Sequence, residues 1–222
     1  MIAPLRPEQR TKLDTTDDRL FYDQPRFVTH VDTGFLDRLT ALYREKLPAN
    51  GRILDLMSSW VSHLPEDVPF SWVEGHGMNA AELERNPQLN HFFVQDLNQT
   101  PQFPLKDNHF DGVINTVSVQ YLQYPEAIFS EIHRVLKPGG VAIISFSNRM
   151  FFQKAIQAWR DGDEPSRVQR VVDYFAGAIA NNQPGFSPPE IIAETGNAPA
   201  LFQLLGLPTA DPFYAVIAQK NA

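Results

Sequence analysis

The stretch FDGVINTVSVQYLQYPEAIFSEIHRVLKPGGVAIISFS (residues 110–147) decides the fold of this chain. It begins with an apolar run over 110–118, which is typical of a buried strand. Pro125 then opens a helix with apolar residues at helical spacing, because proline is favourable in a first turn. The turn KPGG ends that helix, and a second apolar run covers 140–147. A strand, a helix and a strand in this order predict a doubly wound, mostly parallel sheet.

The same alternation continues on both sides of this stretch. Short apolar runs between turn residues predict strands, and amphipathic stretches between the runs predict helices. Asn79 is expected to cap a short helix beginning at Ala80, with Glu82 three positions on as in a capping box. Beyond 110–147, the predicted strands are 52–57, 70–74, 91–95 and 213–220, and the other predicted helices are 34–47, about 151–160 and 168–181.

The chain of 222 residues suits a single α/β domain. Residues 1–50 are expected to form an N-terminal helical segment and residues 51–148 a nucleotide-binding core. Residues 149–210 are expected to form a helical cap inserted before a final strand at 211–220. The predicted fold class is therefore a Rossmann-like, doubly wound, mostly parallel sheet with a cap.

Composition excludes several kinds of protein. The net charge of −7 argues against a nucleic-acid partner, although a local basic site for an anionic small molecule remains compatible with it. Without cysteine there is no disulfide, thiolate zinc site or cysteine nucleophile. No apolar run resembles a signal peptide or reaches the roughly 20 residues of a membrane span. We expect a cytoplasmic protein with no membrane partner, and the sequence leaves its oligomeric state open.

Several catalytic motifs are missing from the sequence. It contains no G-x-x-x-x-G-K-[ST] phosphate loop and no G-x-S-x-G nucleophile elbow. The nicotinamide fingerprint G-x-G-x-x-G does not occur either. Neither H-E-x-x-H nor a paired His/Asp spacing is present, so no metal site is expected. A ligand is instead expected at the carboxyl ends of the strands.

Those strand ends carry a recognisable series of motifs. ILDLMSSW (53–60), VEGHGMN (73–79) and VQDLN (94–98) precede FDGV, and RVLKPGG (134–140) follows it. In order and spacing, roughly residues 50–150 resemble class I S-adenosylmethionine (SAM)-dependent methyltransferases, most closely those of type 11. The resemblance implies the class I methyltransferase fold, SAM as cofactor, S-adenosylhomocysteine (SAH) as product, and a small-molecule methyl acceptor.

Two positions depart from the family pattern. The loop D-x-G-x-G-x-G is replaced here by Asp55 followed by Met57, Ser59 and Val61. SAM would then rely on serine hydroxyls, backbone N–H groups, or a helix N-terminus at 59–62 that could hold its carboxylate. The acidic residue that binds the ribose in the family corresponds to Gly77. Glu74 or Asn79 could replace it.

The resemblance implies that Asp96 meets the adenine amine and that Leu97 packs on the base. A general base is optional in methyl transfer, because the need for one depends on the acceptor. Arg26, His30 and Gln120 are further candidates on the acceptor side. The predicted cofactor-binding residues are Tyr22, Asp55, Met57, Ser58, Ser59, Glu74, Gly75, Gly77, Asn79, Asp96, Leu97, Asn98, Val117 and Ser118, and the predicted catalytic residues are His63, Tyr121, Asn148 and Arg149.

Two other functions compete with methyl transfer. The glycine-free loop and Gly77 would also suit a protein of this fold that has lost SAM binding and serves as an inactive binding or interaction module. A cavity filled by Met57 or Trp60 would favour that alternative. The third possibility is an enzyme of this fold that uses another ligand or another chemistry. A nucleic-acid methyltransferase fits the negative charge less well.

Overall fold

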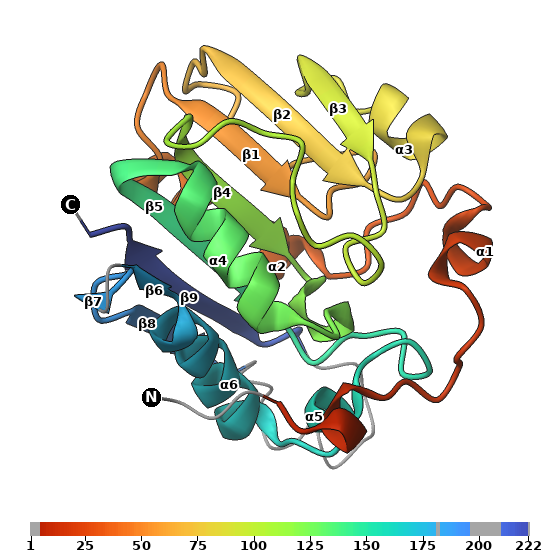
Figure 1. Cartoon of the computed structure of the whole chain (residues 1–222). Coiled ribbons are helices and arrows are strands. Elements are labelled where there is room, and N and C mark those ends of the chain that lie inside the picture. Colours follow the sequence, from red (N-terminus) through yellow and green to blue (C-terminus); the bar gives the residue numbers. More distant parts are fainter. Residues whose placement is uncertain (1–4, 181–182, 196–209, 222) are drawn as a thin grey trace, which may run out of the picture.

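A seven-stranded sheet organises the chain in the computed structural model, which describes residues 5–180, 183–195 and 210–221 (Figure 1). Its order is β3-β2-β1-β4-β5-β9-β8. The strands are β1 (Arg52–Leu56), β2 (Trp72–Gly77), β3 (His91–Val94), β4 (Phe110–Thr116), β5 (Leu136–Phe146), β8 (Glu190–Glu194) and β9 (Phe213–Gln219), and β6 (Ile179–Ala180) pairs separately with β7 (Gln183–Pro184). The helices are α1 (Asp18–Tyr22), α2 (Thr33–Lys46), α3 (Ala80–Glu84), α4 (Pro125–Val135), α5 (Gln157–Arg160) and α6 (Glu164–Gly177), with 3-10 turns at Pro7–Arg10 and Val119–Tyr121.

Strand direction defines where a ligand can bind. The strands β3, β2, β1, β4 and β5 pair in parallel, whereas β9 runs antiparallel to both β5 and β8. The chain leaves β1 toward β2 on one side and returns to β4 on the other. This switch point opens a crevice at the carboxyl ends of β1 and β4. The predicted doubly wound, mostly parallel fold is confirmed.

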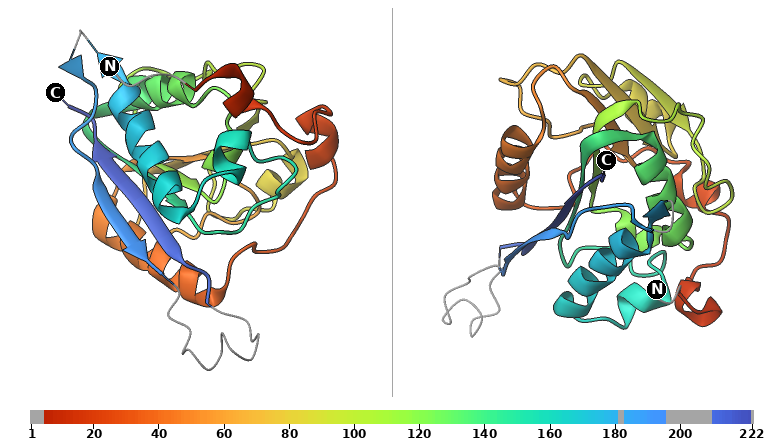
Figure 2. Two further views of the ribbon diagram at one scale, coloured as in Figure 1. Left: turned by 90° about the horizontal axis from the view of Figure 1, so that it is seen from below. Right: turned by 60° about the vertical axis from the view of Figure 1, so that its left-hand side comes forward.

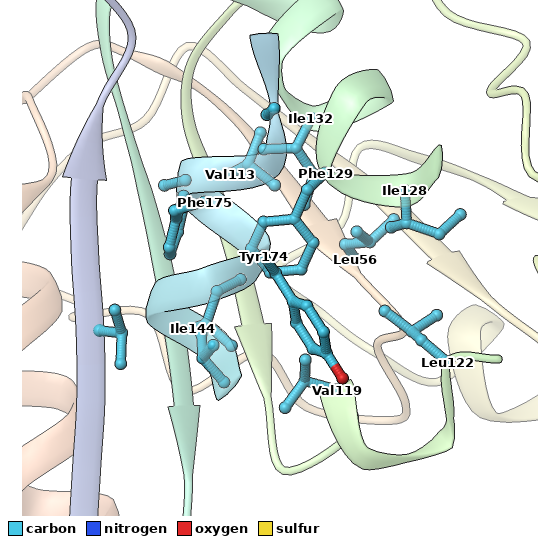
Figure 3. Close-up of a cluster of buried hydrophobic side chains, with 14 of the residues drawn as sticks. Leu56, Val113, Val119, Leu122, Ile128, Phe129, Ile132, Ile144, Tyr174 and Phe175 are labelled. Carbon is cyan, nitrogen blue, oxygen red and sulfur yellow. The ribbon is translucent and has the colours of Figure 1, made fainter. Parts of the chain in front are cut away.

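Both faces of the sheet are covered, which explains the continuous apolar runs of the central strands. α2 lies on one face, and α4 and α6 lie together on the other (Figures 1 and 2). Leu54 of β1 packs into the α4 and α6 side, whereas its neighbour Ile53 packs into the α2 side. Phe129 of α4 contacts both Tyr174 and Phe175 of α6, with ring centroids 5.4 and 4.9 Å apart (Figure 3).

The segment predicted as a cap is placed differently. α6 packs against α4 and β9 on the sheet face, and β8 joins the sheet edge. Within the described part of residues 149–210, the portion that reaches the strand ends is the stretch before α5, and residues 196–209 lie outside the described residues. Amphipathic periodicity predicted these elements but not the layer in which they pack.

Three helix boundaries differ from the prediction by more than one residue. α6 ends at Gly177 rather than 181, and β6 follows at Ile179–Ala180. The stretch 151–156 is a turn, because the backbone N–H of Ile156 bonds to the distant carbonyl of Gln120 at 3.0 Å. α6 begins at Glu164 rather than 168, because the Asp163 carboxylate accepts from the N–H of Ser166 at 3.0 Å and caps it. The charged stretch 161–167, which separates the two predicted helices, therefore contains the cap and the first turn of α6.

Candidate functional site

A cavity lies where the fold predicts it, at the carboxyl ends of β1 to β4. The strand ends form its floor, and α1 with the segment between α1 and α2 forms an outer wall together with Phe151. The cavity is open, and Met57 and Trp60 line it rather than fill it. The lining from the strand ends consists of Asp55, 57–63, 76–79, Glu82, 95–98, 116–118 and 121–122, and the outer wall adds Asp18, Tyr22, Arg26 and 28–31.

Most residues singled out from the sequence meet in this cavity. His30 of the N-terminal segment lines it as well, although it is distant in sequence from the strand ends. The predicted residues in the lining are Tyr22, Asp55, Met57, Ser58, Ser59, Gly77, Asn79, Asp96, Leu97, Asn98, Val117 and Ser118, together with Arg26, His30, His63 and Tyr121. Glu74, Gly75, Gln120, Asn148 and Arg149 are not part of it.

Glu74 and Gly75 lie too early in β2 to reach the cavity. The Glu74 carboxylate is buried and accepts from the indole N–H of Trp72 at 2.9 Å. It also contacts the Nδ1 atom of His91 on β3 at 2.5 Å. A Cβ at Gly75 would collide with Leu89, 2.4 Å away, so this glycine allows close packing below the strand end. Both residues belong to the body of the sheet.

Asn148 and Arg149 are exposed and are not part of the cavity lining. The Arg149 Nε atom donates to the Asp211 carboxylate at 2.7 Å. Asp211 in turn accepts from the N–H of Asp32 at 2.9 Å. Arg149 therefore braces the start of α2 against the chain entering β9, and the catalytic assignment of these two residues finds no support in the geometry.

His76 holds the glycine-free loop after β1. Met57 has a positive φ of 60°, and its N–H donates to His76 Nδ1 at 3.1 Å. The next N–H, that of Ser58, donates to the His76 carbonyl at 2.6 Å. Since Nδ1 accepts, Nε2 carries the proton and donates to the carbonyl of Gln95 at 3.0 Å. Burial lowers the pKa of His76 to about 4, so the ring stays neutral.

The loop also explains why β2 ends in glycine. A Cβ at Gly77 would stand 2.7 Å from the carbonyl oxygen of Ser58. The close backbone approach that the family loop makes with its own glycines is thus made here at the end of β2. No side chain fits at position 77, and residues 57–71 contain no helix. The predicted helix N-terminus at 59–62 is therefore wrong, because no helix begins in this loop.

Asp55 lies beneath this loop. Its carboxylate is buried and accepts from the Ser58 hydroxyl at 2.5 Å. Burial raises the pKa of Asp55 to about 6, and the serine hydroxyl bonds oppose that rise in part. A carboxyl group with a pKa of about 6 thus lies near the carboxyl end of β1, beside the switch point between β1 and β4.

Glu82 connects three parts of the site and was missed as a site residue. The Asn79 side chain accepts from the Glu82 N–H at 3.1 Å, as a cap should. The Glu82 carboxylate does not complete a capping box. It accepts from the N–H of Arg26 at 2.7 Å and from the Ser59 hydroxyl at 2.6 Å. It therefore presents an acidic group beside the end of β2, where Gly77 presents none.

The ends of β3 and β4 form the other side of the cavity. Asp96 accepts from the N–H of Asn98 at 2.9 Å, which leaves carboxylate capacity free toward the cavity. Val117 has a positive φ of 49° and turns the chain sharply after β4. Ser118 follows, and its hydroxyl oxygen is buried without a hydrogen-bond partner among the described residues. An unpartnered buried hydroxyl in a cavity lining is a group that a ligand can satisfy.

Aromatic and imidazole side chains line the part of the cavity where the sequence predicts the methyl acceptor. The N–H of Phe151 donates to the Tyr121 hydroxyl at 2.8 Å. Burial raises the pKa of Tyr121 to about 12, so this phenol remains protonated. His30 packs edge-to-face on Phe151 with ring centroids 5.1 Å apart. Burial lowers the pKa of both His30 and His63, which favours their neutral forms.

Two kinds of feature are absent from the described residues: a metal-binding group of side chains and a membrane-spanning helix. These residues contain no group of three or more His, Asp or Glu side chains arranged to hold a metal ion. They also contain no helix that is long and apolar enough to cross a membrane.

The fold and the position of this cavity define a class I, Rossmann-like methyltransferase architecture. A SAM-dependent methyltransferase from Archaeoglobus fulgidus superposes with a TM-score of 0.56 at 14% identity, over 83% of this chain and 92% of that one. Phosphoethanolamine N-methyltransferase 2 of Haemonchus contortus, solved in complex with SAM, gives 0.54 at 15% identity, over 86% and 54%. At such identity these likenesses establish the fold.

Sequence comparison identifies the family more closely. The model of the type 11 methyltransferase domain matches residues 75–144, which confirms the resemblance to class I SAM-dependent methyltransferases. The bifunctional biotin biosynthesis protein BioHC of Teredinibacter turnerae is 29% identical over 106 residues, which is 48% of this chain and 18% of that protein. Malonyl-[acyl-carrier protein] O-methyltransferase of a Marinomonas species is 28% identical over 95 residues, which is 42% and 34%. The matches thus span 34% or less of the length of these relatives.

Proposed function

We propose that this chain binds SAM in the cavity at the ends of β1 to β4 and transfers its methyl group to a small-molecule acceptor. The observation that supports this most strongly is that the strand ends of the matched methyltransferase domain, including Asp96, line one open cavity. An inactive module with a blocked site is disfavoured, because Met57 and Trp60 leave the cavity open.

The side chains in the cavity suit the parts of SAM. Asp96 and Leu97 would receive the adenine, and Asp55 with Ser58 would lie near the methionyl amine. Glu82 would accept from the ribose hydroxyls in place of an acid at the end of β2. Carboxylates also complement the positive sulfonium, and the open hydroxyl of Ser118 gives a further polar contact.

SAM supplies a methyl group on a sulfonium, ready for in-line displacement by a nucleophile. The protein would then exclude water and align the acceptor with the methyl group. Holding two reactants in the reactive geometry can lower a barrier by about 7–11 kcal/mol. Neutral His30 and His63 could each take a proton from an O–H or N–H acceptor. Both line the cavity, so either can meet an acceptor there.

Calorimetric titration with SAH tests the proposal directly. We expect saturable one-to-one binding at micromolar SAH, with adenosine triphosphate as a control ligand that has the adenine and ribose but lacks the methionyl group. Binding of neither SAM nor SAH at millimolar ligand would refute the proposed function. Tight binding of triphosphate together with weak binding of SAH would assign the cavity to another nucleotide.

A further inference from the structure

Arg26 is the one arginine or lysine in the cavity lining over the described parts of the chain. It lies in the outer wall, four residues after Tyr22. The other formally charged residues of the lining are acidic: Asp18, Asp55, Glu82 and Asp96. A single cation among carboxylates is expected to pair with one of them unless the fold keeps them apart.

The fold keeps Arg26 apart from those carboxylates. Asp18 pairs with Lys12 and, at 3.2 Å, with Lys154. Glu82 accepts the backbone N–H of Arg26, not its guanidinium. Among the described residues, no carboxylate oxygen lies within ion-pair distance of the Arg26 side chain, whereas other arginines such as Arg134 and Arg149 have such partners.

The guanidinium is nevertheless held in a defined place. Its Nη2 atom donates to the carbonyl of Phe21 at 2.8 Å. Its central carbon stands 4.5 Å from the ring centroid of Phe21, 5.5 Å from that of Phe151 and 5.9 Å from that of Tyr22. Aromatic faces attract a cation without neutralising it. The side chain is thus positioned before any ligand arrives, and several of its donors remain free.

We propose that Arg26 binds a carboxylate of the ligand in this cavity. The planar fork of a guanidinium matches a carboxylate with two parallel hydrogen bonds. The loop after β1 contains no helix whose N-terminus could receive such a group, and among the described residues Arg26 is the arginine or lysine of the lining that can receive it. The carboxylate belongs either to the methionyl group of SAM, in which case the inference rests on the proposed function, or to the methyl acceptor.

Paired titrations distinguish the two sources. SAH carries the methionyl carboxylate, whereas 5′-methylthioadenosine has the same nucleoside and sulfur without it. Both are titrated into wild type, R26Q, R26K and the control R19Q, whose parent side chain is exposed and bonded to Asp17 outside the cavity. Benzoate, an aromatic carboxylate, is titrated into each protein alone and into its SAH complex.

If Arg26 holds the methionyl carboxylate, R26Q weakens SAH at least tenfold, R26K weakens it less, and methylthioadenosine affinity is unchanged. If it holds the acceptor, both nucleosides bind R26Q normally and benzoate binding is lost. Equal weakening of SAH and methylthioadenosine, or no change with any ligand, overturns the assignment. If wild type binds neither nucleoside, the proposed function fails, and the benzoate titration of the protein alone decides for or against Arg26.

Discussion

Two regions line the same cavity by different means. The strand ends at Asp96 to Asn98 and at Val117 to Ser118 keep the family pattern and offer side chains to a ligand. The loop after β1 lacks the glycines of the D-x-G-x-G-x-G pattern, and its neighbours His76 and Gly77 hold its shape. The close backbone approach at this end of the sheet is thus made by a glycine of β2, whereas the ends of β3 and β4 contribute side chains to the cavity lining.

The largest effect on the free energy of unfolding is expected from placing an acidic residue at position 77, where the type 11 pattern has one. Gly77→Asp places a Cβ 2.7 Å from the Ser58 carbonyl, which is backbone and cannot yield easily. We expect the free energy of unfolding to fall by about 4 kcal/mol, from overpacking and from a buried carboxylate, with loss of SAH binding. Urea unfolding and calorimetry measure the two effects.

Gly177→Ala is the matched control, because no atom lies within 4 Å of the added Cβ. It should change the free energy of unfolding by less than about 1 kcal/mol. If Gly77→Asp bound SAH as well as wild type, the contrast between the two regions would be lost, since the loop would not depend on that glycine.

The second effect concerns the pH dependence of the free energy of unfolding. Two buried groups, Asp55 and His76, change it in opposite directions over the same pH range, so their effects cancel in the wild type. The folded-state pKa of Asp55 is raised to about 6, so its stabilising contribution is full below its unfolded value near 4 and is lost as pH rises through 6. The folded-state pKa of His76 is lowered to about 4, so its contribution is full above its unfolded value near 6.5 and is lost as pH falls through 4.

Asp55→Asn removes the contribution of Asp55, so the pH dependence caused by His76 becomes visible in the free energy of unfolding. Between about pH 4 and pH 6.5, the free energy of unfolding of wild type minus that of the variant should fall by about 3 kcal/mol. Urea unfolding across this range measures the difference, with Asp37→Asn on the exposed face of α2 as a control that follows wild type. Parallel curves for wild type and Asp55→Asn would show that Asp55 is not buried as an ionisable group.

The third effect is on ligand affinity and tests Asp96 at the end of β3, where the sequence follows the type 11 pattern. Asp96→Ala should weaken SAH and methylthioadenosine equally, by about tenfold or 1.4 kcal/mol, because the adenine is common to both ligands. Calorimetric titration measures the two affinities. Unchanged affinity for both would remove Asp96 from the site, and a loss confined to SAH would move it to the methionyl end.

The smallest effect concerns Glu82 as the substitute acid. Glu82→Gln keeps the side-chain shape and one acceptor but removes the charge, and should weaken SAH about fivefold, or 1 kcal/mol. Glu74→Gln is the matched control, since Glu74 is equally buried but bonds to Trp72 and His91 away from the cavity. Equal weakening by the two changes would mean that Glu82 acts through the sheet and not on the ribose.

Sequence reasoning predicted the parallel core well, because buried strands leave long apolar runs and their helices begin at Pro125 or at caps such as Asn79. It predicted the strand-end residues for the same reason, since strand ends of a parallel sheet meet at one edge. It failed for Glu74 and Arg149, whose partners His91 and Asp211 are distant in sequence. It also missed His76 and Glu82, whose roles depend on hydrogen bonds to Met57 and Arg26.

The sequence by itself determined the order of strands and helices, the family resemblance and the edge of the sheet at which the cavity lies. Apolar periodicity and turn residues are local, so they can be read along the chain. Only the tertiary structure showed that Gly77 allows a close approach to the loop after β1, that the Glu82 carboxylate lies beside the end of β2, and that Arg26 lines the cavity without an ion-pair partner among the described residues. These features depend on contacts between residues that are distant in sequence. The spacing of residues along the chain does not reveal such contacts.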